Sequence, residues 1–309
     1  MSKVKNYLSL IKFSHTIFAM PFAFIGFFLG YSKIKNQLGN FNLNKAIGWD
    51  YHNREAKDGK ELLLRFVLVI LCMVFARSAA MAFNRYLDRQ FDARNPRTAI
   101  REIPKGIISA GSALRFTLAS CLLFLVSCYF INPTCFYLAP LALFVILFYS
   151  YTKRFTPLCH LVLGIGLSLA PIGAYLAVTG SFALLPVLFS LAVIFWVSGF
   201  DIIYALQDEE FDKSQNLYSM PAWLGKAKAL RVSEFLHMLS ALAVIAAGFA
   251  GGFGAWYIAG TLLFVSMLFY QHSLVKPNDL TRVNLAFMTA NGIASVVFAV
   301  FVITDLLLK

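Results

Sequence analysis

The sequence is poor in charged residues: they make up only 14% of its 309 residues, whereas 59% are hydrophobic. With a mean hydropathy of +0.71, this composition excludes an ordinary water-soluble globular protein. Apolar stretches near the length of a bilayer crossing recur from end to end, which indicates a polytopic membrane protein. The stretches are continuously apolar and do not alternate, so a transmembrane β-barrel is excluded and an all-α fold is expected.

Cysteines at metal-binding or redox spacing are also missing. The five cysteines are scattered through apolar segments with no CxxC or Cys/His pattern. We therefore expect small buried side chains at these positions and neither a disulfide framework nor a zinc site.

Nine membrane-spanning helices are predicted, in a single domain over residues 1–309. Each predicted span is close to the ~20 residues that a helix needs to cross a bilayer. The first is longer than the apolar region of a signal peptide and lacks a small-residue cleavage site, so we expect a retained helix. The spans lie at 13–32, 62–83, 114–131, 134–151, 160–179, 183–206, 229–250, 253–272 and 284–307.

The basic residues predict the orientation. With a cytoplasmic N-terminus, 18 of the 27 basic residues fall on the cytoplasmic side. Most of the others lie in or beside the long, charge-balanced connector 33–65, which weighs less in the positive-inside rule. The net charge of +12 therefore reflects topology and anionic headgroups, and no nucleic-acid partner is expected. In this orientation spans two and six both end in the cytoplasm.

An acidic cluster, NRYLDRQFD at 84–92, directly follows span two. Its polar residues Asn84, Asp88 and Asp92 are spaced i, i+4, i+8. Each step of four residues rotates a helical side chain by only about 40°, so all three are expected on one stripe of a helix.

A second acidic cluster, DIIYALQDEEFD at 201–212, ends span six. Asp201, Asp208 and Asp212 are spaced i, i+7, i+11, which again keeps one face. The Asp-x-x-Phe-Asp end of each cluster is the same, which indicates a degenerate internal repeat in parallel orientation.

Carboxylates on one stripe repel each other, so the clusters have no structural benefit by themselves. Their oxygens are hard ligands suited to Mg²⁺, which takes one or two carboxylates together with phosphate oxygens. We therefore predict divalent cations between the two clusters and a phosphorylated substrate. The alternative, a solvated helix end with interspersed arginines, explains neither the shared stripe nor the second cluster.

Basic residues near the clusters fit the same site. Arg97, Lys153 and, less clearly, Arg154 are expected to bind diphosphate oxygens, although each alone could mark topology or contact a headgroup. Arg77 lies about two turns deeper than Asn84. Because an arginine inside a span is usually paired or functional, we expect its partner to be a substrate carboxylate or one of the aspartates.

Together these motifs resemble those of the UbiA superfamily of intramembrane prenyltransferases. The resemblance rests on N-x-x-x-D-x-x-x-D, on D-x-x-Y-x-x-x-D-x-x-x-D and on a YxxxKR-like stretch from Tyr149 to Arg154. Many relatives have Asp after the first Asn, where this chain has Arg85. The resemblance implies a helical bundle around a central cavity, with a polar cytoplasmic cap over two Mg²⁺ ions and an isoprenyl diphosphate.

The resemblance also implies roles for single residues. Asn84, Asp88, Asp92, Asp208 and Asp212 would hold magnesium and diphosphate, and Arg97, Lys153 and Arg154 would bind diphosphate oxygens. Asp201 would belong to the same catalytic cap, and Tyr204 would face the substrates. The ring proton of the acceptor needs a base, for which an aspartate of the second cluster is a candidate.

The acceptor is expected to be an aromatic carboxylate. Two branches of the superfamily resemble this chain closely in the stretches IKFSHTIFAMPFAF (11–24) and ARSAAMAFNRYLD (76–88). One prenylates 4-hydroxybenzoate for ubiquinone, and the other prenylates 1,4-dihydroxy-6-naphthoate in futalosine-type menaquinone synthesis. Both rings suit Arg77; we take the 4-hydroxybenzoate type, acting in the bacterial cytoplasmic membrane, as the expected function.

Two other classes of membrane protein share some of these features. A cation-coupled secondary transporter also uses intramembrane carboxylates, but its repeats are commonly inverted and its acids lie near the midplane. A CDP-alcohol phosphotransferase needs D-G-x-x-A-R within one acidic run, and that string is absent.

Overall fold

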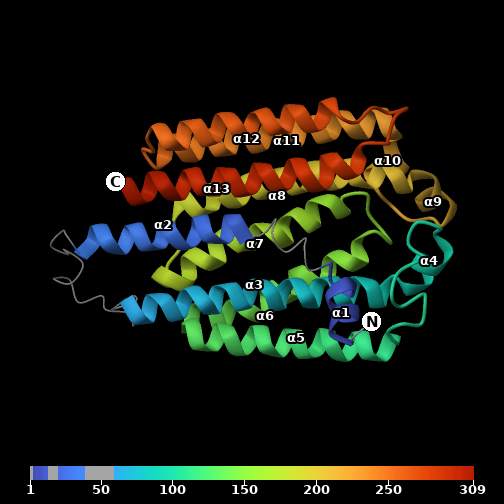
Figure 1. Cartoon of the computed structure of the whole chain (residues 1–309), viewed down its shortest axis with the longest axis horizontal. Coiled ribbons are helices and arrows are strands. Elements are labelled where there is room, and N and C mark those ends of the chain that lie inside the picture. Colours follow the sequence, from blue (N-terminus) through green and yellow to red (C-terminus); the bar gives the residue numbers. More distant parts are fainter. Residues whose placement is uncertain (1–2, 13–19, 39–58) are drawn as a thin grey trace.

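The computed structural model describes residues 3–12, 20–38 and 59–309, and its regular elements there are helices (Figure 1). The all-α prediction is therefore confirmed. The long helices are α2 (Met20–Leu38), α3 (Gly59–Leu87), α5 (Ala110–Ile131), α6 (Pro133–Thr152), α7 (Cys159–Thr179), α8 (Leu184–Ala205), α11 (Lys226–Ala250), α12 (Ala255–Ser273) and α13 (Asn291–Leu308). A π-helical turn, η4 (Leu285–Ala290), leads into α13.

Seven helical segments of the described chain are long and apolar enough to cross a membrane. They correspond to predicted spans two to seven and nine, and they make the chain an integral membrane protein. The remaining two predicted spans coincide with α2 and α12, which are not among these seven. The count of nine crossings stays a prediction, and residues 13–19 of the first predicted span lie outside the described residues.

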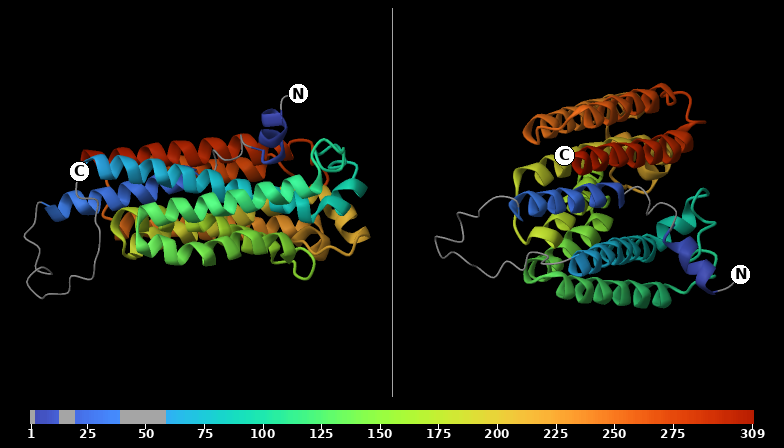
Figure 2. Two further views of the ribbon diagram at one scale, coloured as in Figure 1. Left: turned by 90° about the horizontal axis from the view of Figure 1, so that it is seen from below. Right: turned by 60° about the vertical axis from the view of Figure 1, so that its left-hand side comes forward.

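The helices form two groups that α2 and α7 join (Figures 1 and 2). Helices α3, α5 and α6 pack together on one side, and α8, α11, α12 and α13 pack on the other. Helix α7 contacts α2, α6 and α8, so it connects the groups. Short helices α4 (Arg89–Arg94), α9 (Glu209–Ser214) and α10 (Met220–Leu224) gather at one end of the bundle, and the C-terminus lies at the opposite end (Figure 1).

Two glycines bring α7 into backbone contact with its neighbours. A Cβ atom added at Gly26 of α2 would lie 2.0 Å from the carbonyl oxygen of Pro171, and one added at Gly164 would lie 2.5 Å from that of Ile194 in α8. Small residues at crossings allow this close approach between helices in a membrane. The position of α7 against α8 is therefore fixed within narrow limits.

The interior is mainly aromatic and aliphatic, with Phe22, Phe189, Trp196, Phe264 and Phe298 fully buried in one cluster between α2, α8, α12 and α13. All five cysteines are free; Cys128 and Cys159 are buried, and the other three are half-buried.

Candidate active site

The two acidic motifs have a similar backbone around Asp88 and Asp208. Asp88 separates α3 from α4 with φ −89° and ψ 5°, and Asp208 precedes α9 with φ −105° and ψ 4°. Both following helices are six residues long. The local repeat seen in the sequence is thus also a structural repeat.

Neither motif is one uninterrupted helix, since α3 ends at Leu87 and α8 at Ala205. Asn84 and Asp88 still share a face, because their side chains are hydrogen-bonded. Asp88 lies in the bridge region of φ/ψ space between the end of α3 and the start of α4. Asp88 accepts hydrogen bonds from Arg154 Nη2 at 2.8 Å and Asn84 Nδ2 at 3.1 Å. Asp92 is buried and instead accepts from Arg101 Nη1 at 2.6 Å.

Asp208 of the second motif pairs with residues that follow the first motif. Arg97 donates from Nε at 3.0 Å and also from Nη2, and Asn95 Nδ2 donates at 3.0 Å. Arg97 donates a further hydrogen bond, from Nη1 to the hydroxyl of Tyr204 at 3.0 Å. These contacts join segments more than 100 residues apart and place both motifs at one end of the bundle, as expected.

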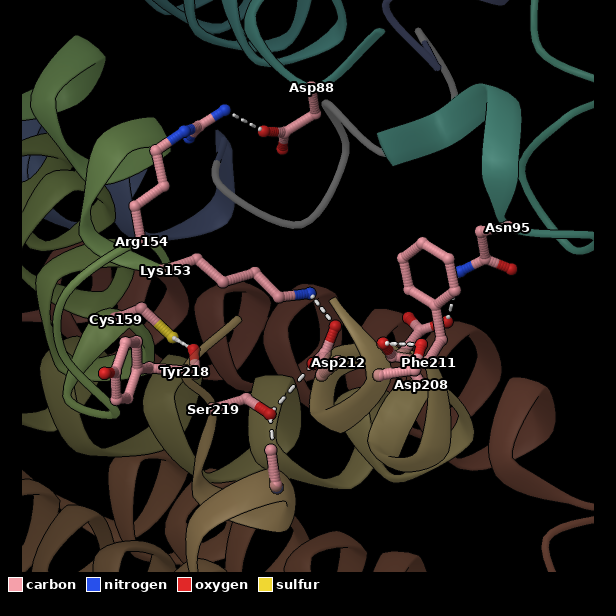
Figure 3. Close-up of polar contacts among 12 residues, drawn as sticks. Asp88, Asn95, Lys153, Arg154, Cys159, Asp208, Phe211, Asp212, Tyr218 and Ser219 are labelled. Carbon is pink, nitrogen blue, oxygen red and sulfur yellow. Dashed lines mark hydrogen bonds and ion pairs between the residues drawn. The ribbon is translucent and has the colours of Figure 1, made fainter. Parts of the chain in front are cut away.

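The end of α6 also contacts both motifs (Figure 3). Arg154 reaches Asp88 of the first, and Lys153 Nζ lies 2.7 Å from Asp212 Oδ1 of the second. Ser219 donates to the other oxygen of Asp212 at 2.9 Å. The three cations that the sequence assigned to the site are therefore each paired with an aspartate assigned to it.

Burial affects the charges at this end. It raises the pKa of the Asp88 carboxyl, and Arg154 only partly opposes this. For Lys153 burial disfavours the charged amine, but the adjacent Asp212 outweighs it, so the pKa of Lys153 is raised. An ionised Asp88 is thus incompletely compensated by Arg154 alone.

Magnesium fits the residues present. Within the described chain no three Asp, Glu, His or Cys side chains converge as a complete metal cage, but Mg²⁺ takes only one or two carboxylates beside phosphate and water. One oxygen of Asp92, Oδ2, is buried with no hydrogen-bond partner. Such an orphaned oxygen is a suitable hard ligand.

A cavity of about 460 Å³ lies between α3, α5, α6 and α7. Its walls are mostly apolar, with Arg77 and Tyr149 among the lining residues. Arg77 Nε is buried without a hydrogen-bond partner, and no ion pair of Arg77 occurs in the described part of the chain. The alternative that Arg77 pairs with an aspartate is therefore not found.

Several residues of the site were missed by the sequence reasoning. Asn95, Arg101 and Ser219 hold motif aspartates, and His160 lies 2.6 Å from Asp201. Residues in loops show no periodic sequence pattern that would reveal such contacts. His160, however, stands at the start of an apolar run, seven residues after Lys153, and this position could have indicated its contact with Asp201.

The sequence of this chain matches a known protein family. Residues 56–293 match the UbiA prenyltransferase family. The chain belongs to this family. It is therefore a prenyltransferase embedded in the membrane, and the transporter and phosphotransferase alternatives are set aside.

Among its relatives are two 4-hydroxybenzoate octaprenyltransferases. The one from Aromatoleum aromaticum is 30% identical over 249 residues, or 80% of this chain and 84% of that protein. The one from Tolumonas auensis is 31% identical over 239 residues, or 77% of this chain and 82% of that protein.

Two solved structures share the fold. The apo UbiA homolog from Aeropyrum pernix K1 superimposes with a TM-score of 0.74 at 28% identity, covering 95% of this chain and 97% of that chain. The homolog from Archaeoglobus fulgidus bound to DMAPP and Mg²⁺ gives a TM-score of 0.72 at 20% identity, covering 98% of this chain and all of that one.

Proposed function

We propose that this prenyltransferase transfers a polyprenyl group from polyprenyl diphosphate to the ring of an aromatic hydroxy acid of the 4-hydroxybenzoate type, with Mg²⁺, in quinone biosynthesis. One observation carries the proposal: two carboxylate motifs, cross-linked through cationic side chains, adjoin the helices that form an apolar cavity containing an unpaired arginine. The names of the relatives support the acceptor class.

The diphosphate is bound by exchange of ion pairs. The three cations Arg97, Lys153 and Arg154 are only partly buried and can turn from their aspartates to the phosphate oxygens. This turn frees the carboxylates for metal binding. The residues that would hold magnesium are Asn84, Asp88, Asp92, Asp208 and Asp212.

When bound, magnesium supplies positive charge that stabilises the diphosphate as it leaves. The DMAPP and Mg²⁺ in the Archaeoglobus fulgidus homolog, which has the same fold, support this assignment. Arg97, Lys153 and Arg154 act in the same direction as fixed charges placed where negative charge develops.

The cavity accommodates the prenyl chain and the acceptor. Its apolar walls suit the isoprenoid, and the Arg77 guanidinium binds the acceptor carboxylate. As the carbon–oxygen bond of the donor breaks, an allylic cation forms. The Tyr149 ring in the cavity and the Tyr204 ring, which lies 5.3 Å from the Arg97 guanidinium carbon, offer π faces that attract cations.

Product formation by the isolated protein tests the proposal. Membranes or detergent-solubilised protein are incubated with Mg²⁺, a long-chain prenyl diphosphate, and either 4-hydroxybenzoate or 1,4-dihydroxy-6-naphthoate. We expect prenylated 4-hydroxybenzoate. Product with the naphthoate alone would assign the chain to the menaquinone branch. No product with either ring, together with binding of a different acceptor, overturns the proposal.

A further inference from the structure

One buried polar pair at the site is not used by the chemistry described so far. His160 is the second residue of α7, and its Nδ1 lies 2.6 Å from Asp201 Oδ2 of α8. The imidazole is almost fully buried, whereas 25% of the Asp201 side chain is exposed. Asp201 makes no other hydrogen bond within the described part of the chain, so its second oxygen is free.

The second nitrogen of His160 identifies the tautomer. The backbone N–H of Met220 donates to Nε2 at 3.2 Å. Because an N–H group can only donate, Nε2 must carry a lone pair and the proton must be on Nδ1. His160 is therefore a neutral imidazole that donates its one N–H to Asp201.

This partner distinguishes Asp201 from the other aspartates of the site. Asp88, Asp92, Asp208 and Asp212 are each paired with an Arg or Lys side chain. A cationic partner holds its carboxylate by charge as well as by hydrogen bonding, whereas a neutral donor orients the carboxylate by hydrogen bonding alone. Asp201 is thus oriented by one hydrogen bond and keeps a second oxygen without a partner among the described residues, which can take up a proton.

Asp201 also lies at a suitable depth. A helix rises 1.5 Å per residue, so Asp201 lies ~10 Å further into the bundle than Asp208. By the same measure Arg77 lies ~16 Å further into the bundle than Asp88. Tyr149 of the cavity lies close enough to both Asp201 and Arg77 for their charges to act on it. An acceptor whose carboxylate is bound by Arg77 therefore places its ring toward Asp201, between Arg77 and the diphosphate.

We propose that His160 is a positioning residue that holds Asp201 as the base for the ring proton; this rests on the proposed function. The donor carbon–oxygen bond breaks, and the diphosphate leaves with the electron pair. The ring carbon beside the acceptor hydroxyl forms the new carbon–carbon bond. Its proton moves to the free oxygen of Asp201, the C–H electrons restore the aromatic ring, and Asp201, whose side chain is 25% exposed, releases the proton to water.

The surrounding helices hold His160 in place. Gly164, one turn further along α7, packs directly on α8, and the backbone N–H of Met220 holds the other ring nitrogen of His160. The imidazole therefore has little freedom to leave Asp201, which is the property that a positioning residue needs.

Replacement of the imidazole tests the proposal. For His160→Leu we expect kcat to fall on the order of 10- to 100-fold, part of the 10²–10⁴-fold effect of general-base catalysis, with an unchanged KM for the prenyl diphosphate. Proton removal becomes slower, so an acceptor deuterated on the ring should give a larger isotope effect than in the wild type. His160→Asn, whose amide N–H lies near the position of Nδ1, should recover most of the lost kcat.

Two controls separate this role from a structural one. Ser198→Ala removes a buried hydroxyl that lies 3.1 Å from the His160 carbonyl and donates to the Ile194 carbonyl at 2.6 Å, but it leaves the imidazole intact, and it should keep the wild-type kcat and isotope effect. Donor labelled with ¹⁸O in the bridging position should still scramble its label in His160→Leu, because scrambling needs carbon–oxygen cleavage but no base.

The outcomes are distinct. Wild-type kcat and isotope effect in His160→Leu, an equal loss in Ser198→Ala, no recovery in His160→Asn, or loss of label scrambling in His160→Leu each overturn the positioning role. Failure of the proposed function itself appears differently, as a wild-type protein that neither forms product nor scrambles the donor label.

Discussion

Arg77 offers the sharpest prediction about the acceptor. In Arg77→Leu the cavity loses the guanidinium that we assign to the substrate carboxylate. A hydrogen bond to a charged group contributes about 1.5–3 kcal/mol, which corresponds to a rise of about 10- to 150-fold in the acceptor KM. The KM for the prenyl diphosphate should stay unchanged, because the diphosphate contacts lie at the motif end of the bundle.

The same substitution should not destabilise the protein. Arg77 Nε is buried without a hydrogen-bond partner, and a buried unsatisfied polar group opposes folding by about 1–3 kcal/mol. Leucine fits the mostly apolar walls of the cavity. We therefore expect the Tm of the detergent-solubilised variant, without substrates, to equal or exceed that of the wild type.

The assay is steady-state product formation with two acceptors, 4-hydroxybenzoate and the same phenol without its carboxylate. The wild type should strongly prefer the acid, Arg77→Leu should show little preference, and Arg77→Lys should lie between them because an amine lacks the bidentate geometry of a guanidinium. An unchanged acceptor KM in Arg77→Leu, or a preference for the acid as strong as in the wild type, would refute the reasoning.

Two further predictions concern the metal and the motifs. Asp88→Asn and Asp208→Asn should each abolish product formation at normal membrane levels of the protein, measured by quantitative blotting of the membrane fraction; activity in both variants would contradict the metal assignment. Adding both Mg²⁺ and an unreactive prenyl thiodiphosphate should raise the Tm, whereas either one alone should raise it much less. The reason is that the carboxylates stay paired with Arg97, Lys153 and Arg154 until the phosphates bind these basic side chains. An equally large rise in Tm with Mg²⁺ alone would contradict this exchange.

The helices could largely be predicted from the sequence because continuous apolar runs mark the part of each helix inside the bilayer. The predicted span 134–151 differs little from α6, at Pro133–Thr152. Where the run ends in polar residues the helix continues, as α3 does from Gly59 to Leu87 against a predicted 62–83. Hydropathy locates the apolar window, whereas backbone hydrogen bonding determines the helix ends.

The meeting of the two motifs was also predictable, because each follows an even-numbered span and so must emerge at the same end. Their partners were not. The pairing of Arg97 with Asp208 and of Lys153 with Asp212 joins distant segments, and residue spacing carries no information on such contacts. The break of the helix at Asp88 is likewise set by a local conformation that the i, i+4, i+8 pattern does not reveal.

The central claim is that both motifs bind one metal–diphosphate unit while the cations turn from carboxylate to phosphate. A crystal structure with Mn²⁺ in place of Mg²⁺ and a prenyl thiodiphosphate, with the metals located by anomalous scattering, tests it most directly. The account predicts manganese in contact with Asp88 and Asp208 oxygens and with the phosphates, and Arg97, Lys153 and Arg154 on phosphate oxygens. Metal bound by one motif only, with the present ion pairs intact, would contradict it.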